Sequence, residues 1–399
     1  MRTILNGKSI VLGVTGSIAA FKAADLASKL TQAGTAVDVV LTRSAQEFVG
    51  VATFAGLTHR PVSTGLYESN SELGIDHVVL ARRADLVLIA PATANILAKL
   101  ALGVTDDVLT ATVLAGSQPL VIAPAMDAGM YGSPATQANV ETLRGRGVHF
   151  IGPESGRLAS GLVGQGRMTE VPGIIGHLRA VLGRNGDLAG RRVVVSAGGT
   201  EEAIDPVRVL TNRSSGKMGY AIAEAARDRG ADVTLISAPS ALPSPPCVTL
   251  ATVGSALEMR DAVQSACAGS DLLIMAAAVS DYRPANPADQ KIKKTGDDSL
   301  IIELVQNPDI VAGVTGDRLV KVAFAAETNN IIENADAKLL AKGVDLIVAN
   351  DITAEHSGFG TDTNAVTFVY PDREPEQMPL MDKFDVGNAL LDRVLPLLN

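Results

Sequence analysis

The sequence predicts an α/β protein made of two doubly wound, parallel-sheet domains of the Rossmann-like kind. Short apolar runs rich in Val, Ile and Leu alternate with amphipathic stretches of helical period, as parallel sheets covered on both faces require. The chain has 399 residues, more than one hydrophobic core usually organises. A polar, Gly-rich segment at 183–190 interrupts the pattern, which then begins again. We therefore expect a domain at 1–182, a linker at 183–190 and a second domain at 191–399.

The apolar runs locate the strands of each domain. In the first domain the expected strands are Lys8–Val14, Ala36–Leu41, Asp85–Ala90, Pro119–Ala123 and Val148–Ile151. In the second domain they are Arg192–Ser196, Ala231–Ser237, Asp271–Ala276, Leu319–Ala323 and Asp345–Ala349. Helical patterns connect these strands, which predicts right-handed strand–helix–strand units.

Composition narrows the class of partner. The formal net charge of −9 argues against a nucleic-acid-binding surface, so cationic clusters are expected to bind small anionic ligands. No apolar run is long enough to span a bilayer, and the N-terminus lacks a signal-peptide pattern, so we expect a cytoplasmic protein without a membrane partner. Cys247 and Cys267 have neither metal nor redox spacing.

The segment Thr211-Asn-Arg-Ser-Ser-Gly-Lys-Met-Gly219 combines small hydroxyl residues, a glycine and two cations just ahead of a helical run. Backbone N–H groups at a helix start, beside fixed positive charge, form a phosphate pocket. A P-loop would need a glycine at Thr211 and Ser or Thr at Met218. The segment therefore predicts a phosphate or nucleotide site of another kind.

Three loops of the first domain follow predicted strands, where open α/β sheets bind ligands. They are Gly13-Val-Thr-Gly16-Ser-Ile-Ala-Ala, Pro91-Ala-Thr-Ala-Asn95 and Pro124-Ala-Met-Asp127. The glycine spacing at 13–18 differs from the dinucleotide fingerprint and favours a mononucleotide phosphate. Taken singly, each loop also fits a turn that merely packs.

Two further features of the first domain leave alternatives open. An isolated His such as His77 is more often a satisfied residue than a catalyst. The Gly-rich stretch 152–168 contains Arg157 and Arg167, and fits either a loose loop or a lid that closes on an anion.

Taken together, these elements resemble the flavin-dependent cysteine decarboxylases, the family that contains phosphopantothenoylcysteine decarboxylase, over residues 8–170. The resemblance implies a flavodoxin-like domain that binds FMN, whose redox chemistry supplies the electron sink for loss of CO2. The implied FMN contacts are Gly16, Ser17, Ile18, Thr42, Ser44, Thr93 and Ala125. The implied substrate contacts are Asn95, Met126, Asp127 and Arg167, with His77 as the catalytic base and Ser160 at the position of the catalytic acid.

Two positions depart from this family's usual pattern. Asp127 stands where Asn is common, and an ionised carboxylate can only accept hydrogen bonds and would repel a substrate carboxylate. Ser160 stands where a Cys acts as the acid in the reductive step, and a hydroxyl is a much weaker acid than a thiol. These departures bear on the catalytic role of Ser160 more than on the flavin or the fold.

Loops of the second domain resemble the phosphopantothenate–cysteine ligase family over about 191–370. The matching segments are Gly198–Arg208, Asn212–Gly219, Met275–Pro284, Lys291–Lys294, Asn307–Val311, Phe324–Asn329 and Ala349–Asp351. The resemblance implies that CTP activates the carboxylate of 4′-phosphopantothenate as an acyl-cytidylate, from which the amine of cysteine displaces CMP. Mg²⁺ is expected to bridge the phosphates. Asp281 is one candidate ligand, and the full set of protein ligands is not assigned.

The ligase resemblance also implies residue roles. Asn212 would hold the acyl group or its phosphodiester, and Lys291, Lys338 and Lys342 would neutralise the triphosphate. The implied nucleotide contacts are Met275, Ala276, Ala277, Asp281, Pro308, Asp309, Ile310, Val311 and Phe324. A solvated face is the preferred interpretation for Lys293 and Lys294 and, without the resemblance, also for Lys338 and Lys342.

Bacterial members of the two families are fused in this order, so the chain is expected to make 4′-phosphopantetheine for coenzyme A in two steps. Flavin domains of the first family form trimer-based assemblies and the ligases form dimers, which implies a homo-oligomer. One alternative is an active ligase, or a regulatory flavin-binding protein, whose decarboxylase half is impaired. Another is an NAD-dependent dehydrogenase, which the glycine spacing at 13–18 disfavours.

Overall fold

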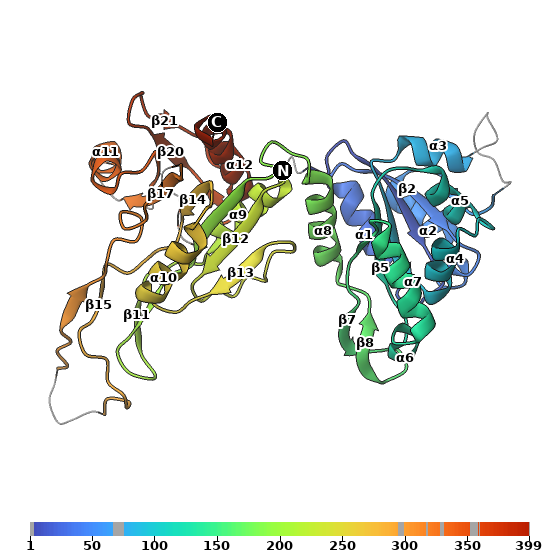
Figure 1. The fold of residues 1–399 in the computed structure, drawn as a ribbon, viewed down its shortest axis with the longest axis horizontal. Coiled ribbons are helices and arrows are strands. Elements are labelled where there is room, and N and C mark those ends of the chain that lie inside the picture. Colours follow the sequence, from blue (N-terminus) through green and yellow to red (C-terminus); the bar gives the residue numbers. More distant parts are fainter. Residues whose placement is uncertain are drawn as a thin grey trace. The chain divides into compact units, whose positions relative to one another are not determined.

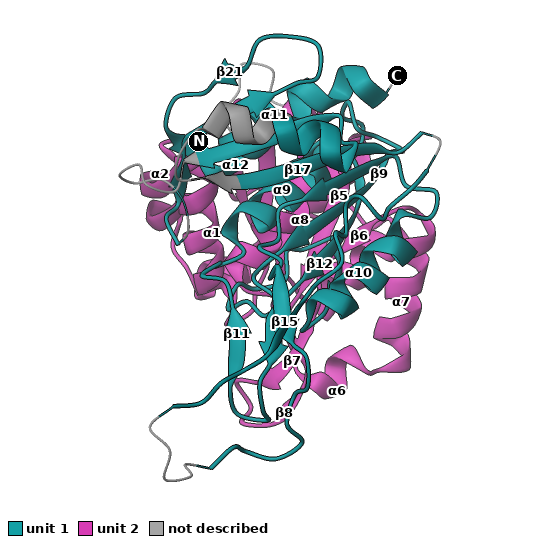
Figure 2. Ribbon diagram, turned by 90° about the vertical axis from the view of Figure 1, so that its left-hand side faces the viewer, with its two compact units in different colours: residues 1, 183–399 teal, residues 2–182 magenta. Residues whose placement is uncertain are grey.

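The computed structural model describes residues 4–66, 76–293, 299–316, 318–327, 331–351, 358 and 360–398. Contacts within the chain divide it into two compact units, one of residues 2–182 and the other of residue 1 with residues 183–399 (Figure 2). Each unit has a central sheet with helices on both of its faces (Figure 1). The predicted fold class, α/β with parallel sheets, is confirmed.

The first unit contains a six-stranded, parallel sheet in the order β3-β2-β1-β4-β5-β6. Its strands are β1 Ser9–Val14, β2 Ala36–Leu41, β3 Val62–Ser63, β4 Leu86–Ala92, β5 Leu120–Pro124 and β6 His149–Phe150. β-Branched and apolar residues fill β1, β2 and β4 because both faces of these strands are buried.

Helices cover both faces of this sheet, each with its own apolar core. One face packs against α1 Ala20–Gln32, α2 Val51–Thr58 and α8 Val171–Gly183. The other packs against α3 Asp76–Arg83, α4 Ala94–Leu102, α5 Val108–Ala115 and α7 Pro134–Gly145. The Gly-rich stretch predicted to be a lid forms an antiparallel hairpin of β7 Glu154–Arg157 and β8 Val163–Arg167, near the short helix α6 Ala128–Tyr131.

The second unit contains an eight-stranded sheet in the order β13-β12-β9-β14-β17-β18-β20-β21. The parallel strands are β9 Arg192–Ala197, β12 Asp232–Ser237, β13 Thr249–Thr252, β14 Leu272–Met275, β17 Val320–Glu327 and β18 Leu346–Asp351. Two antiparallel strands that the sequence analysis did not anticipate, β20 Val366–Val369 and β21 Glu376–Gln377, extend one edge.

Helices also lie on both faces of the second sheet. α9 Lys217–Asp228 and α12 Lys383–Val394 share one core, and α10 Ala256–Cys267 packs with α11 Ile331–Lys342 on the other. Three small antiparallel pairs stand apart from the sheet. They are β10 Glu201–Ala203 with β11 Val209–Thr211, β15 Tyr282–Pro284 with β16 Leu304–Gln306, and β19 Thr363–Asn364 with β22 Met381–Asp382.

A buried carboxylate fastens α3 to the first sheet. Asp38 of β2 is only 5% exposed, and its two oxygens accept from Arg60 Nε (2.8 Å) and Arg83 Nη2 (2.6 Å). Arg83 is the last residue of α3, the helix that carries His77. Asp38 therefore anchors one end of that helix.

We expect Asp38→Asn to lower the free energy of unfolding by about 3 kcal/mol, because it leaves two guanidinium groups without their shared charge. Asp25→Asn is the matched control, since Asp25 pairs with Lys29 on an exposed face of α1 and should cost under about 0.5 kcal/mol. Hydrogen exchange of first-unit peptides across a urea series measures both. Equal losses in the two variants would contradict the anchoring role.

Candidate active sites

The first candidate site lies where the central strands of the first unit end. β1 pairs with β2 on one side and with β4 on the other, so the order of strands reverses at β1. Ligands of doubly wound sheets bind at such a reversal, beyond the carboxyl ends of the strands. The predicted flavin residues Thr42 and Thr93 directly follow β2 and β4, and Gly16 follows β1 by two residues.

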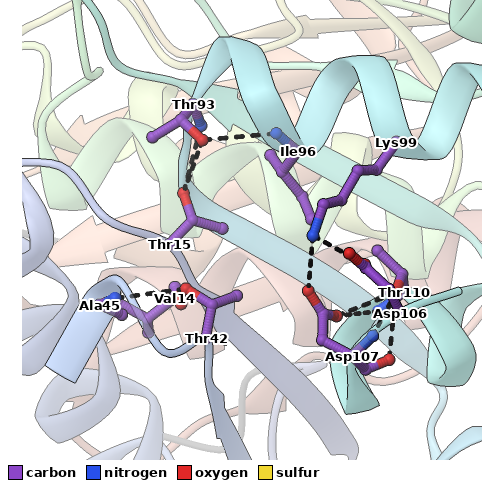
Figure 3. Close-up of polar contacts among 10 residues, drawn as sticks. All are labelled: Val14, Thr15, Thr42, Ala45, Thr93, Ile96, Lys99, Asp106, Asp107 and Thr110. Atoms are coloured by element: carbon purple, nitrogen blue, oxygen red, sulfur yellow. Dashed lines mark hydrogen bonds and ion pairs between the residues drawn. The ribbon is translucent and has the colours of Figure 1, made fainter. Parts of the chain in front are cut away.

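Thr15 joins the loops that follow β1 and β4 (Figure 3). Its hydroxyl donates to the carbonyl of Pro91 (2.8 Å) and accepts from the N–H of Thr93 (3.2 Å). The hydroxyl of Thr93 in turn caps α4 by accepting from the N–H of Ile96 (3.4 Å). Figure 3 also shows Lys99, which ties α4 to the acidic residues at the start of α5.

The turn at Gly16 lies against the loop that follows β2. A Cβ on Gly16 would meet the Cβ of Ser44 at 2.5 Å, so no side chain fits at this position. The hydroxyl of Thr42 accepts from the N–H of Ala45 (3.3 Å), which fixes that loop. The structure thus brings together the predicted FMN contacts of the first two loops.

This turn offers free donors at the start of α1. Within the described part of the chain, the backbone N–H groups of Gly16 and Ile18 form no hydrogen bond, and the hydroxyl of Ser17 accepts only from the N–H of Ala19 (3.3 Å). Unpaired N–H groups at a helix start bind phosphate well. The residues present therefore fit the phosphate of the implied FMN.

The loop after β5 carries the next predicted contacts. The buried Ala125 donates its N–H to the carbonyl of Ala92 (2.9 Å), and Met126 donates its own to Gly166 of β8 (3.0 Å). A Cβ on Gly166 would lie 2.2 Å from the carbonyl oxygen of Met126. Glycine at 166 therefore lets the β7–β8 hairpin run alongside this loop.

The two departures from the decarboxylase pattern contact each other. Ser160, in the turn of the hairpin, donates its hydroxyl to Asp127 Oδ2 (2.6 Å), and Asp127 Oδ1 accepts from the N–H of Gly129 (3.0 Å). The Ser160 bond, followed by the Gly129 bond, lowers the pKa of Asp127 below its usual value. Asp127 is therefore ionised at neutral pH, and its charge faces a hydroxyl of the hairpin.

The remaining predicted residues of this site differ in their exposure and in the partners that their side chains already have. Asn95 is exposed on α4. Arg167 pairs with Glu170 (2.8 Å) and faces Glu154 (3.6 Å), so its guanidinium already has carboxylate partners. His77, on α3, keeps a buried Nδ1 without a hydrogen-bond partner, and no hydrogen bond among the described residues links it to the flavin loops.

The second candidate site is a cavity of about 490 Å³ in the second unit. Most residues that the ligase resemblance implies line it. These residues are Asn212, Met275, Ala276, Ala277, Asp281, Pro308, Asp309, Ile310, Val311, Phe324, Lys338 and Lys342. They come from the loop between β11 and α9, the end of β14 and the loop after it, the segment 306–311, β17 and α11.

Hydrogen bonds hold the loops of this cavity to one another. The amide of Asn212 donates to the carbonyls of Ala278 (3.3 Å) and Val279 (3.2 Å) beyond β14. Asn307 donates its side chain to Ser280 (2.8 Å) and its N–H to Asp281 (2.8 Å). The β14 loop is therefore tied to both neighbouring walls.

Two further lysines line this cavity, Lys217 and Lys383. Lys217 lies in the segment 211–219 that was predicted to bind phosphate, whereas Lys383 was not predicted from the sequence. Lys383, the first residue of α12, is buried and donates to the carbonyls of Gly358 (3.0 Å) and Thr361. Burial, followed by the charge of Lys217, lowers the pKa of Lys383. Lys217 pairs with Asp362 (2.7 Å). No local sequence pattern indicated position 383, because the partners of Lys383, Gly358 and Thr361, lie 25 and 22 residues away in the chain.

Lys291 does not line this cavity. Its side chain is exposed on the segment that follows β15. Lys342, by contrast, pairs with Asp309 (3.2 Å) in the cavity wall. Among the described residues, no group of three or more His, Cys, Asp or Glu side chains could hold a metal ion.

Comparison with known proteins covers both units. Residues 2–183 match the family described as Flavoprotein, and residues 188–397 match the one described as DNA/pantothenate metabolism flavoprotein C-terminal domain. The coenzyme A biosynthesis bifunctional protein CoaBC of Vibrio vulnificus strain YJ016 is 45% identical over 398 residues, 99% of each chain. The chain belongs to the CoaBC family. The CoaBC proteins of Bacillus subtilis and Escherichia coli are 44% and 43% identical, over 99% and 98% of this chain and 98% and 97% of theirs.

Solved structures resemble parts of this CoaBC-family chain. The C-terminal domain of a CoaBC protein is 40% identical and covers 53% of this chain and 97% of its own, with a TM-score of 0.46. The FMN-dependent cysteine decarboxylase SpaF is 36% identical and covers 41% of this chain and 91% of its own, with a TM-score of 0.37.

Within the described residues, no helix is both long enough and apolar enough to cross a membrane.

We expect Gly16→Ala to weaken FMN binding by about tenfold or more, because the new Cβ forces the Gly16 turn away from Ser44. Gly50→Ala is the matched control, since its Cβ would meet nothing within 4 Å. The dissociation constant of FMN, titrated into apoprotein by fluorescence, measures both. Unchanged FMN affinity in Gly16→Ala would place the cofactor elsewhere.

Proposed function

We propose that the chain makes 4′-phosphopantetheine in two steps. Residues 191–399 join 4′-phosphopantothenate to cysteine through an acyl-cytidylate made from CTP, and residues 1–182 decarboxylate the 4′-phosphopantothenoylcysteine with FMN. The segment 183–190 links the two domains. The observation that carries the proposal is the cavity of the second unit, where twelve of the thirteen ligase residues named from sequence line one hollow in a chain that resembles CoaBC proteins along its whole length.

The cavity suits the ligation chemically. Its volume of about 490 Å³ falls within the range of roughly 300–1,000 Å³ that small-molecule sites occupy. Lys338 and Lys342 line it in an otherwise acidic protein, and would neutralise the triphosphate as pyrophosphate leaves. Asn212 is an exposed residue of the lining and would hold the acyl group. Mg²⁺ would bridge the phosphates, with Asp281 as one candidate ligand.

The first unit suits the decarboxylation. Bound FMN would supply the oxidation and reduction that make loss of CO2 possible. The free N–H groups of Gly16 and Ile18 and the hydroxyl of Ser17 would hold its phosphate, with Thr42, Ser44, Thr93 and Ala125 around it. A neutral imidazole at His77 would take the proton of the substrate thiol. The hairpin that carries Ser160 would exclude water from the substrate.

A flavin-binding protein with an impaired decarboxylase half is not favoured. The bifunctional relatives are 43–45% identical over 98–99% of this chain, so the match includes the first unit. Ser160 also donates a hydrogen bond to Asp127. The two residues that depart from the family pattern therefore contact each other, and they are not two unrelated substitutions.

The protein is proposed to act as a cytoplasmic homo-oligomer, trimer-based through its flavin domain and dimeric through its ligase domain. Large apolar side chains such as Ile18 and Phe21 in the first unit, and Tyr282 and Ile301 in the second, are more than half exposed. In the proposed assembly, neighbouring subunits would cover these side chains. Neither Cys247 nor Cys267 forms a disulfide, as suits a reducing compartment.

A coupled assay tests the proposed function. We expect purified, FMN-loaded protein supplied with 4′-phosphopantothenate, cysteine, CTP and Mg²⁺ to release CMP, pyrophosphate and CO2, and ATP to replace CTP poorly. If CMP forms but no CO2 is released, and synthetic 4′-phosphopantothenoylcysteine also gives no CO2, the decarboxylase half of the proposal is refuted. Absence of cysteine-dependent CMP would refute the ligase half.

We expect Ser160→Ala to slow CO2 release by about tenfold, because the hairpin loses its hydrogen bond to the ionised Asp127. Ser155→Ala is the matched control, since Ser155 is exposed on β7 of the same hairpin. Flavin content and CMP formation in the same samples should stay unchanged. Equal CO2 release from both variants would show that the Ser160–Asp127 contact plays no part.

A further inference from the structure

The segment that carries Lys291 is hydrogen-bonded to the turn of the β10–β11 hairpin. The N–H of Ala288 donates to the carbonyl of Ile204 (3.0 Å), and the N–H of Ile292 donates to Asp205 Oδ2 (3.1 Å). Arg208 Nη2 donates to the carbonyl of Ile292 (3.3 Å). Both backbone groups of the residue next to Lys291 are therefore held by side chains of the turn.

Asp205 is the centre of this contact. It is only 2% exposed, and Oδ1 accepts from the N–H groups of Val207 (2.8 Å) and Arg208 (2.9 Å) within its own turn. Oδ2 takes the N–H of Ile292 and faces the guanidinium of Arg208 (3.3 Å). Burial alone would raise the pKa of Asp205, but these partners outweigh it and the pKa lies below its usual value. The carboxylate is thus ionised and fully engaged at neutral pH.

The same hairpin leads straight into the cavity. β11 ends at Thr211, and the next residue is Asn212, whose amide is fixed by the carbonyls of Ala278 and Val279. Only the three residues of β11 separate Arg208 from Asn212. The turn that binds the backbone beside Lys291 therefore lies at one end of β11, and Asn212 follows the other end of the same strand.

We propose that Asp205 is a positioning residue for the ligation, fixing with Arg208 the segment of Lys291 to the hairpin that presents Asn212. The inference rests on the proposed function, in which Lys291 acts on the triphosphate. A long lysine side chain on an untethered segment would lose much conformational entropy each time it met its partner. Tethering the adjacent peptide removes part of that cost before the substrate arrives.

Asp205→Asn separates this role from simple stability. The amide keeps one oxygen for the N–H groups of the turn, but it turns an NH2 group, a donor, toward the N–H of Ile292 and the guanidinium of Arg208. Asp205→Glu restores the charge and is the rescue variant. Asp345→Asn is the control, because Asp345 likewise accepts a backbone N–H, that of Lys321 (2.8 Å), and does not line the cavity.

Two measurements on the full-length protein decide the matter. The first is the rate of tryptic cleavage after Lys291 in ligand-free protein, followed by mass spectrometry. The second is the split between kcat and KM for CTP in cysteine-dependent CMP formation. For Asp205→Asn we expect cleavage at least about tenfold faster and kcat lower by about tenfold or more, with KM changed less than about threefold. Asp205→Glu should recover part of both, and Asp345→Asn should match the natural protein.

Each other result overturns the proposal. Unchanged cleavage in Asp205→Asn would show that the carboxylate does not hold the Lys291 segment. Faster cleavage with an unchanged kcat would show that the tether is structural and not a positioning device. The cleavage measurement needs no turnover, so it still decides whether the tether exists if the natural protein forms no CMP, a result that would instead refute the proposed ligation.

Discussion

Both candidate sites depend on loops that approach one another more closely than side chains would allow. In the first unit the backbone at Gly16 lies against Ser44, and that at Gly166 lies against Met126. In the second unit a Cβ on Gly199 would lie 2.7 Å from the carbonyl oxygen of Asn212. Parallel strands deliver these loops to one edge of a sheet, and glycine lets them close into a pocket there. The same constraint thus shapes two sites of different chemistry.

Cations in the ligase cavity are held in place by the protein before any ligand arrives. Lys342 pairs with Asp309, Lys217 with Asp362, and Lys383 is anchored by backbone carbonyls. Each partner limits the number of positions the ammonium group can take, so less order must be imposed when an anion binds. The overall charge of the chain is negative, which leaves these few lysines as a local exception that favours a phosphate-bearing ligand.

The sequence predicted those features of the fold that depend on the pattern of neighbouring residues. Strand runs such as Ala36–Leu41 became β2 with the same bounds, because burial on both faces demands continuous apolar residues. The loop after β14 supplied one wall of the cavity, residues 276–281, since the position of a strand end follows from the sheet itself. The antiparallel strands β20 and β21 were not anticipated, because their short runs resemble loops when read locally.

What the sequence could not supply were pairings between distant side chains. Nothing in the pattern around Asp127 or Ser160 shows that they touch, and nothing near Arg167 shows that Glu154 and Glu170 share its guanidinium. Lys291 was expected beside the other ligase lysines, yet its backbone is tethered to a hairpin turn outside the cavity wall. Such contacts depend on how loops fold back, which local periodicity does not encode.

The place of Lys383 in the chain has a consequence for how the protein comes into being. Domains generally fold as units from the N-terminus while the ribosome is still working. Every loop of the flavin site lies before residue 170, so that pocket can close around its cofactor early in synthesis. The ligase cavity lacks part of its wall until the last helix, which begins at Lys383, has emerged. A nascent chain therefore acquires its two pockets at different times, and the one proposed to perform the first chemical step is completed second.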